Sequence, residues 1–571
     1  MWHIKFLNIC RSLLWPSRPE PSKSRKIAGY RLTFSGFSML LIFTLIGAQS
    51  IALALSKTNI SAHSYTTIND KARGAILDQK GRILASTVPV NILYADPKHI
   101  FNPEDVASAL LPYVPKLDKQ TLTKRLTKKG RFIELDRKLT PKRHSAILQL
   151  GLPGIYVKPA TIRIYPQGRE AAHIIGAVDR DNNGIAGIEK SQNETLASGE
   201  NVYLSIDTGL QTILREVLDT QIKKFEALGG AALILDIKTG EIIAATSLPD
   251  FDPNHIMTST DTARFNQVTK GVYEMGSIFK VLNTAIALET SAIDMQSTID
   301  VSKPIRVAGQ LINDYDPIKG SIGLAEILVR SSNIGSAHIG QLIGSETQKN
   351  YMKQLGLLSA SPLEIVENGV PLVPQNWSHI TTMTVSFGYG LSVSMAQAAA
   401  AIAAAGGDGH YIAPTLLRRN SNEPIEKLRI FSTETSMAVR SMMRLVVSNK
   451  IGTGNFADAP GYLVGGKTGT AEKVKNKKFN RKANRVSFVA TFPANDPAYL
   501  IMMMVDEPVG QKHSNDYATA GWVVAPAIKN VVNQIAPILG VHPVDITKPE
   551  NRRNLLPPIM LDGKEAVYAS F

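Results

Sequence analysis

A serine and a lysine three residues apart, Ser277 and Lys280, mark the stretch that most constrains how this chain can fold. Gly276 precedes the serine and an apolar, alanine-rich helical pattern follows it, so Ser277 is expected at a helix N-terminus. At this spacing the two side chains share one helix face. A serine hydroxyl needs a neighbouring base to act as a nucleophile. Lysine can be that base only where burial or nearby charge lowers its pKa, so the fold has to build a buried site around this turn.

The composition fits a protein of two or three domains. The chain has 571 residues, 44% of them hydrophobic and 19% charged, which is typical of globular proteins. The formal net charge of +15 would suit nucleic acid, an anionic membrane surface or an acidic polymer. No zinc-finger spacing, phosphate-binding loop or aromatic–basic RNA motif occurs in the sequence, so no nucleic-acid partner is expected. The single cysteine, Cys10, excludes a disulfide framework.

The N-terminal segment has the pattern of a membrane anchor. Residues 1–31 carry seven Lys or Arg against one acid, and residues 33–55 contain no charge. At about 1.5 Å per residue the uncharged run spans about 34 Å as a helix. We therefore expect a cytoplasmic basic tail over 1–31 and one transmembrane helix over 33–55, with the rest of the chain outside. A cleavable signal peptide is the rival interpretation, but the run is too long and begins too late for one.

The part of the chain after the anchor falls into two blocks and a tail. Residues 56–200 mix short strands with Gly and Pro turns, including a hairpin over 73–85 that turns at Lys80-Gly81 and a helical, charged stretch over 101–155. From residue 201 strands and helices are separated, which predicts an α+β domain over 201–545. Its expected strands are 461–473, 486–494 and 499–508, its expected helices include 321–343, 393–409 and 521–535, and residues 546–571 form a tail.

Two further motifs follow the serine–lysine pair. Ser331-Ser332-Asn333 lies on or just before a predicted helix, and Lys467-Thr468-Gly469-Thr470 lies on a predicted strand after two glycines. The forms S-x-x-K, S-x-N and K-T-G in this order are the motif set of penicillin-recognising serine acyl-transfer enzymes. Lys238-Thr239-Gly240 precedes Ser277 and is expected at a hairpin tip, and Ser191-Gln192-Asn193 lies in the first block, so neither copy fits the order.

The chain after the anchor resembles the class B penicillin-binding proteins, which are peptidoglycan D,D-transpeptidases, and most of all their division-specific FtsI type. RGAILDQKGRILA (73–85) is similar to the family's first pedestal motif, with Gln79 where an arginine is usual. VYEMGSIFK resembles its nucleophile motif, with Met275 in place of proline. RIYPQG, AAHIIG, AGIE, FGYGLSVSMAQ and GYLVGGKTGTAEK are also close. The resemblance implies a penicillin-binding-protein/serine β-lactamase-like transpeptidase domain, an antiparallel sheet with helices, after an elongated α+β pedestal of the dimerisation type.

The resemblance also implies a role for each catalytic candidate. Ser277 would attack the penultimate D-alanine carbonyl of a stem peptide, and Lys280 would accept its proton. Ser331 would relay the proton to the leaving amine, and Asn333 would bind a substrate amide and help to hold Lys280. Lys467 would lower the pKa of Lys280 and attract the substrate carboxylate. No cofactor or metal is required.

The substrate-binding candidates lie on the K-T-G strand. Thr468, Gly469 and Thr470 are expected to line the site, with the two threonine hydroxyls on the substrate carboxylate. The backbone N–H groups of Ser277 and Thr470 would form the oxyanion hole. Tyr389 either borders the cleft or only packs, and the sequence leaves both open. The basic loop 473–485 is either solvated or in contact with glycan or a partner, and the methionines 502–504 are expected in the core.

The resemblance implies cross-linking of the septal wall, in the bacterial inner membrane, with a cytoplasmic N-terminus and a periplasmic catalytic domain. The implied partners are stem peptides, β-lactams bound covalently at Ser277, a glycan polymerase of the SEDS type (FtsW) and other divisome membrane proteins. An elongation-branch transpeptidase, a D,D-carboxypeptidase or β-lactamase with the same triad, and a non-catalytic β-lactam-binding scaffold stay open. Glycan polymerase activity is not expected, because residues 56–200 lack the glutamate-centred signature of a glycosyltransferase.

Overall fold

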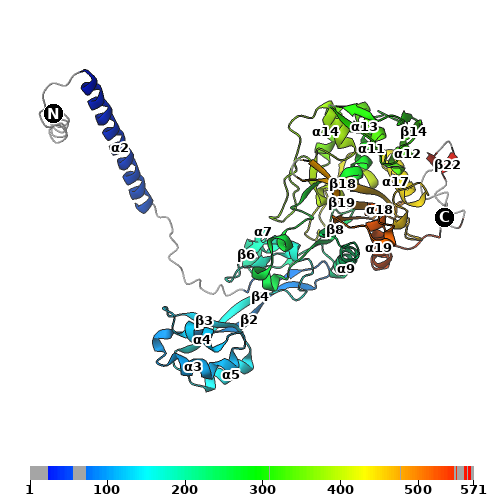
Figure 1. The fold of residues 1–571 in the computed structure, drawn as a ribbon. Coiled ribbons are helices and arrows are strands. Elements are labelled where there is room, and N and C mark those ends of the chain that lie inside the picture. The colour runs from blue at the N-terminus through cyan, green and yellow to red at the C-terminus, as the bar shows by residue number, and fades with distance from the viewer. Residues whose placement is uncertain are drawn as a thin grey trace. The chain divides into compact units, whose positions relative to one another are not determined.

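The structure, a computed structural model, describes residues 23–55, 72–307, 309–475, 478–545, 548, 559–561 and 564–566. Residues 1–70 form one compact unit and residues 71–571 another. In the first unit helix α2 runs from Lys23 to Leu55 and includes the predicted helix over 33–55 (Figure 1). Among the helices that the described residues form, none combines the length and the apolarity needed to cross a membrane. Residues 1–22 of the predicted basic tail lie outside the described residues.

The pedestal is built on a long antiparallel strand pair. The predicted hairpin over 73–85 is confirmed, with Gly81 at φ +81° in its turn, a conformation that glycine adopts without strain. The strand beyond that turn pairs with a second long strand over ten residues. The first, short strand also pairs in parallel with a strand just after the predicted domain boundary at residue 200. These strands are β1 (Ile76–Leu77), β2 (Ile83–Ala95), β4 (Ile155–Ile164) and β7 (Val202–Tyr203).

The far end of the pedestal has its own apolar core. Helices α3 (Pro103–Leu110), α4 (Lys119–Leu126) and α5 (Pro141–Gln149) pack there against β2 and β4 (Figure 1). The prediction that 101–155 is helical was wrong over β3 (Ile133–Leu139). Leu135 and Leu139 of this strand are buried on the side of the helices, because its apolar residues alternate with polar ones at the period of a strand.

The second block is centred on a five-stranded antiparallel sheet in the order β18-β19-β20-β8-β9. The three strands expected near the C-terminus are confirmed, and the Lys238-Thr239-Gly240 copy lies in the turn between the other two. The strands are β8 (Gly229–Asp236), β9 (Ile242–Leu248), β18 (Gly465–Lys475), β19 (Lys478–Phe492) and β20 (Tyr499–Asp506).

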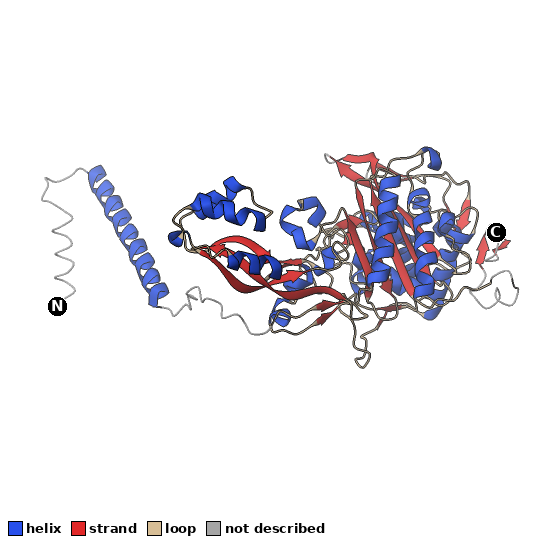
Figure 2. Ribbon diagram, turned by 90° about the horizontal axis from the view of Figure 1, so that it is seen from below, coloured by secondary structure: helices blue, strands red, loops and turns tan. Residues whose placement is uncertain are grey.

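Helices cover both faces of this sheet, so its central strands are apolar on both sides (Figure 2). The methionine run shows the alternation: Met502 and Met504 belong to the core on one face and Met503 to the core on the other. One face carries α11 (Lys280–Glu289), α16 (Met395–Gly406) and α17 (Thr433–Ser448). The other carries α9 (Thr208–Lys224) and α19 (Ala525–Ile538). The predicted helix at 393–409 is thus confirmed, and that at 521–535 corresponds to α18 and α19.

Short elements complete the described chain. The remaining helices are α6 (Ala172–Ile175), α7 (Gly187–Ser191), α8 (Asn193–Ala197), α10 (Asp261–Arg264), α12 (Leu324–Val329), α13 (Asn333–Ile343), α14 (Ser345–Gln354), α15 (His379–Ser386) and α18 (Ala520–Val523). The remaining strands are β5 (Ala177–Val178), β6 (Gly184–Ala186), β10 (Val272–Glu274), β11 (Thr298–Asp300), β12 (Ile305–Val307), β13 (Gln310–Ile312), β14 (Ser321–Gly323), β15 (Ser392–Ser394), β16 (His410–Tyr411), β17 (Leu428–Arg429), β21 (Ile559–Leu561) and β22 (Lys564–Ala566).

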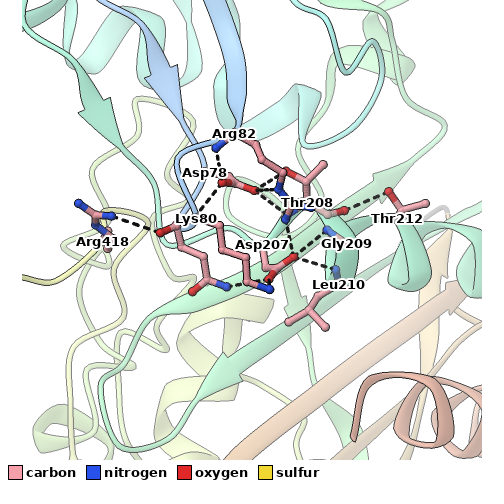
Figure 3. A network of polar contacts seen from close by, with 10 residues as sticks. Asp78, Lys80, Arg82, Asp207, Thr208, Gly209, Leu210, Thr212 and Arg418 are labelled. Atoms are coloured by element: carbon pink, nitrogen blue, oxygen red, sulfur yellow. Dashed lines mark hydrogen bonds and ion pairs between the residues drawn. The ribbon is translucent and has the colours of Figure 1, made fainter. Parts of the chain in front are cut away.

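A charged network joins the pedestal hairpin to the start of α9, and we call it the pedestal joint (Figure 3). The buried Asp78 accepts hydrogen bonds from Arg82 Nε at 2.6 Å and from Thr208 Oγ1 at 2.7 Å. Asp207, the N-cap of α9, pairs with Arg82 Nη2 at 2.7 Å and with Lys80 Nζ at 2.6 Å. Burial opposes the ionisation of Asp207, but its hydrogen bonds and the nearby cations prevail and lower its pKa to about 2.

Candidate active site

The predicted nucleophile lies in a tight turn at the start of the helix on which the site is built. Gly276–Phe279 form a 3₁₀ turn, η4, and α11 begins at Lys280. Gly276 has φ +55°, and a side chain there would collide with the backbone of Thr470. Ser277 is partly exposed, whereas Lys280 is buried. The turn therefore presents the serine at the surface and directs the lysine into the core.

The three sequence motifs meet at one hydroxyl group. Lys280 Nζ lies 3.2 Å from Ser331 Oγ, and it also donates to Ser331 O at 2.5 Å and to Asn333 Oδ1 at 2.8 Å. From the opposite side Lys467 Nζ donates to Ser331 Oγ at 2.8 Å. A hydroxyl can accept one hydrogen bond and donate another, so Ser331 can connect the two amines as a proton path.

Ser331 reaches this place because the chain breaks between two helices. The sequence predicted helix over 321–343 with the S-x-N motif on or just before a helix. The motif lies just before one, because α12 ends at Val329 and α13 begins at Asn333, whereas residues 321–323 form the strand β14. Ser331 takes the left-handed conformation, φ +61°, and the N–H of Ser332 donates to Ile327 O at 2.9 Å. This is the helix-ending arrangement that glycine usually occupies. A serine in this conformation costs about 1 kcal/mol, and it points its hydroxyl and carbonyl at Lys280.

Both lysines have lowered pKa values. Burial lowers the pKa of Lys467 to about 7. For Lys280 burial is the largest cause, the charge of Lys467 adds to it, and Asp314 opposes both, so that its pKa lies well below the usual value of 10.5. A buried amine that is neutral at moderate pH can act as a general base.

The K-T-G strand closes the site along its edge. A side chain at Gly469 would collide with Ser487 of β19 and with Ile278 of the η4 turn, so glycine lets the turn lie close against β18. The hydroxyl of Thr468 is bonded to Thr453 Oγ1 at 2.6 Å, while Thr470 is exposed. Thr453 was not identified from the sequence, because a lone threonine in a loop carries no signal.

The segment around Tyr389, which the sequence left open, lies beside the η4 turn. The N–H of Gly276 donates to Gly388 O at 3.1 Å, and the N–H of Glu472 on β18 donates to Tyr389 Oη at 3.4 Å. Gly390 N–H donates to Glu274 Oε1 at 2.7 Å. Gly388 thus lies against the nucleophile turn, and Tyr389 packs on Phe387 and bonds to the K-T-G strand; a border position of Tyr389 at the cleft stays a prediction.

Sequence reasoning also missed Asn313 and Asp314, which hold the S-x-N motif through three hydrogen bonds and the following Ile334 through a fourth. Neither residue belongs to a recognisable motif, and about twenty positions separate them from their partners. Within the described ranges no group of three or more His, Cys, Asp or Glu side chains could hold a metal ion.

Comparison with known proteins identifies the family. Residues 230–530 match the penicillin binding protein transpeptidase domain, and residues 69–216 match the penicillin-binding protein dimerisation domain. The probable peptidoglycan D,D-transpeptidase FtsI of Caulobacter vibrioides is 36% identical over 482 residues, which cover 82% of each chain. The peptidoglycan D,D-transpeptidase FtsI of Escherichia coli is 29% identical, with 83% of this chain and 85% of the relative covered. The crystal structure of penicillin binding protein 3 of Mycobacterium tuberculosis with ampicillin has a TM-score of 0.68 at 22% identity and covers 85% of this chain and 98% of that one.

This chain belongs to the penicillin-binding proteins that carry a transpeptidase domain behind a dimerisation domain. The predicted resemblance to class B proteins of the FtsI type is confirmed, as is the assignment to the serine D,D-transpeptidases. The transpeptidase fold with a preceding pedestal is confirmed as well, and the solved structure shares that fold.

Proposed function

We propose that this protein cross-links the stem peptides of peptidoglycan through an acyl-enzyme on Ser277 during septal wall synthesis. The observation that carries the proposal is the position of Ser331 Oγ between the nitrogens of Lys280 and Lys467, at 3.2 and 2.8 Å. In this proposal Lys280 is the base next to the nucleophile turn, and Ser331 is the proton path beside it. The relatives named FtsI support the division role.

In the acylation step Ser277 Oγ attacks the penultimate D-alanine carbonyl of a donor peptide. Lys280, neutral because of its lowered pKa, takes the hydroxyl proton. That proton passes through Ser331 to the departing nitrogen, so the peptide bond breaks, D-alanine leaves as an amine, and an ester forms on Ser277. Asn333 binds a donor amide while its Oδ1 holds Lys280.

The close approach of the Gly276 and Thr470 backbones supports an oxyanion hole for this reaction, which the N–H groups of Ser277 and Thr470 would form. Such a donor contributes about 3–4 kcal/mol to the transition state. The buried Thr468 and the exposed Thr470 would bind the donor carboxylate, with Lys467 supplying charge. An amine of a second stem peptide then takes the acyl group from Ser277 and closes the cross-link.

We further propose that residues 33–55 anchor the protein in the inner membrane with the catalytic domain in the periplasm. The support is the uncharged sequence of this stretch, the basic residues before it and its helical conformation. Through this helix and the pedestal the protein would meet a SEDS-type glycan polymerase, FtsW, and other divisome proteins. A two-hybrid signal with the polymerase that survives exchange of residues 33–55 for an unrelated anchor would exclude the helix as the contact.

The decisive experiment is acylation by labelled penicillin. The purified protein should form a stable adduct at Ser277, located by peptide mass spectrometry, and Ser277→Ala should abolish it. Ser302→Ala, at an exposed serine, is the matched control and should label as the wild type does. Labelling of Ser277→Ala would overturn the assignment. Release of the adduct within seconds would indicate a hydrolase instead of a transpeptidase.

A cellular experiment tests the division role. Fluorescent penicillin bound to this protein should collect at mid-cell, and cells that carry only Ser277→Ala should fail to divide. Signal along the lateral wall would assign the protein to the elongation branch. Normal division with the Ser277→Ala variant would indicate a scaffold.

A further inference from the structure

Asp314 lies in the loop after β13. Its carboxylate accepts hydrogen bonds from backbone N–H groups and from a hydroxyl at the S-x-N motif. Its Oδ1 accepts hydrogen bonds from the N–H of Asn333 at 2.5 Å and from the N–H of Ile334 at 3.0 Å. Its Oδ2 accepts from Ser332 Oγ at 2.7 Å. These are the free donors at the N-terminus of α13, where a carboxylate is favoured both as a hydrogen-bond acceptor and by the helix dipole.

The preceding residue fixes the side chain of Asn333. The amide nitrogen of Asn333 donates to the carbonyl oxygen of Asn313 at 2.9 Å. An asparagine amide has its donors on one side and its acceptor on the other. With the nitrogen held by that carbonyl, Oδ1 must face Lys280 Nζ, at 2.8 Å. Asn313 and Asp314 together therefore set both the backbone and the side-chain orientation of the motif.

We propose that Asn313-Asp314 is a positioning segment of the acyl-transfer site, in which Asp314 holds the S-x-N motif, through Ser332 and Asn333, against Lys280 and provides a counter-charge for this buried lysine. The inference rests on the proposed function and adds residues that the three motifs do not contain. Asp314 does not touch the reacting atoms in this arrangement; it acts through the motif.

The charges around Lys280 explain why the site would need this carboxylate. Burial and Lys467 both disfavour the protonated form of Lys280, and Asp314 favours it. On the neighbouring α12 the charges of Glu326 and Arg330 pair with each other at 2.6 Å. Asp314 therefore limits how far the pKa of Lys280 falls, and it keeps the lysine basic enough to accept a proton from Ser277.

Two substitutions at residue 314 separate position from charge. Asp314→Ala removes the acceptor from the N-terminus of α13, and because small misplacements of a catalytic group are costly, the plateau rate of penicillin acylation should fall about 10- to 100-fold. Asp314→Asn keeps an acceptor and should restore most of that plateau rate. It loses the charge, so the pKa of Lys280 falls further and the acidic limb of the pH–rate profile should move down by about half a pH unit, since partial exposure screens the carboxylate.

Asp316→Asn, at an exposed position two residues further on, is the matched control and should leave the rate and the pH profile unchanged. The second-order acylation rate from pH 5 to 9 measures both effects, and thermal unfolding verifies that each variant is folded. An Asp314→Ala variant that acylates at the wild-type rate would overturn the positioning role. If the acidic limb of the pH–rate profile of Asp314→Asn stays in place or moves to higher pH, the role of the charge is overturned. If the wild type and Asp316→Asn also fail to label at Ser277, the proposed function fails instead.

Discussion

Two clusters of buried charge in residues 71–571 follow opposite rules. In the candidate site Lys280 and Lys467 are buried and face a hydroxyl, a carbonyl and an amide. In the pedestal joint the buried carboxylates Asp78 and Asp207 face cations directly. The pKa of Lys467 moves to about 7, towards its neutral form, while that of Asp207 moves to about 2, towards its charged form.

The difference teaches what each cluster contributes. Buried charges that are paired and hydrogen-bonded stabilise their charged state, so the joint holds the hairpin of the pedestal on α9. Buried amines that lack a directly bonded carboxylate are destabilised as cations, so the site keeps at least one lysine ready to accept a proton. The pedestal joint therefore stabilises the fold, whereas the buried lysines of the site cost stability and provide a reactive amine. Four substitutions test this contrast, from the largest expected effect to the smallest.

Lys280→Met should separate activity from stability most strongly. Penicillin acylation should fall by about 10³-fold, within the range for loss of a general base, because Lys280 is the amine that would take the proton of Ser277. Stability should stay equal or rise, because a buried amine is replaced by an apolar side chain of similar length. Acylation rates and thermal midpoints measure the two. Lys303→Met, at an exposed lysine, should change neither. A Lys280→Met protein that is strongly destabilised would contradict the contrast.

Asp207→Ala at the joint should give the reverse result. It removes two ion pairs and the N-cap of α9, and the free energy of unfolding should fall by about 2–3 kcal/mol, since the exposed ends of Lys80 and Arg82 screen the pairs. The acylation rate of the folded protein should stay within about threefold. Asp219→Ala removes an exposed ion pair on the same helix and should lower the free energy of unfolding far less.

The lowered pKa of Asp207 predicts how its contribution to stability changes with pH. Its folded pKa is lowered, so its contribution is fully present above the unfolded value of about 3.9 and is lost as the pH falls towards about 2. The difference in stability between the wild type and Asp207→Ala should therefore shrink only below about pH 4. A difference that already shrinks near neutral pH would contradict the lowered pKa.

Lys467→Met should stabilise the protein modestly, by about 1–2 kcal/mol, in a pH-dependent way. The folded pKa of Lys467 is about 7 and the unfolded value about 10.4, so the cost of burying the cation is largest at and below pH 7 and disappears as the pH rises through that interval. Thermal midpoints of the variant and the wild type from pH 6 to 10 measure this. A gap that widens with pH would exclude a lowered pKa.

The smallest effect is expected at Lys80, whose side chain is more than half exposed. Lys80→Ala should cost less than about 1 kcal/mol. Gln79 Nε2 lies 3.2 Å from the same oxygen of Asp207, and the family motif that this hairpin resembles has arginine at this position. Adding Gln79→Arg to Lys80→Ala should restore the lost stability. If the double variant is no more stable than Lys80→Ala, an arginine at position 79 does not replace Lys80 as the partner of Asp207.

The sequence predicted the parts of the fold that depend on local pattern. The apolar run of β20 and the hairpin at Gly81 follow from strand periodicity and from the turn that glycine permits. It failed where tertiary contacts override the local pattern. Within 321–343 the sequence indicated helix on both sides of the S-x-N motif, but it did not predict the left-handed conformation of Ser331, whose carbonyl accepts from Lys280 and whose hydroxyl accepts from Lys467. β3 was missed because it is a strand of seven residues within a charged region of mostly helical pattern. What identifies it is the packing of its apolar residues in the core of the pedestal.

The sequence by itself determined the reactive groups: Ser277 and Lys280 are set three residues apart at the start of a helix, and the motif order identified the family. Only the tertiary structure decided their chemical state. Lys280 is 51 positions from Ser331, and Lys467 is 136 positions from it, so no local spacing could place one hydroxyl between the two nitrogens. The carboxylate of Asp314 is also remote in the chain from Lys280. Burial and the distances between charges set a pKa, and both are properties of the folded chain.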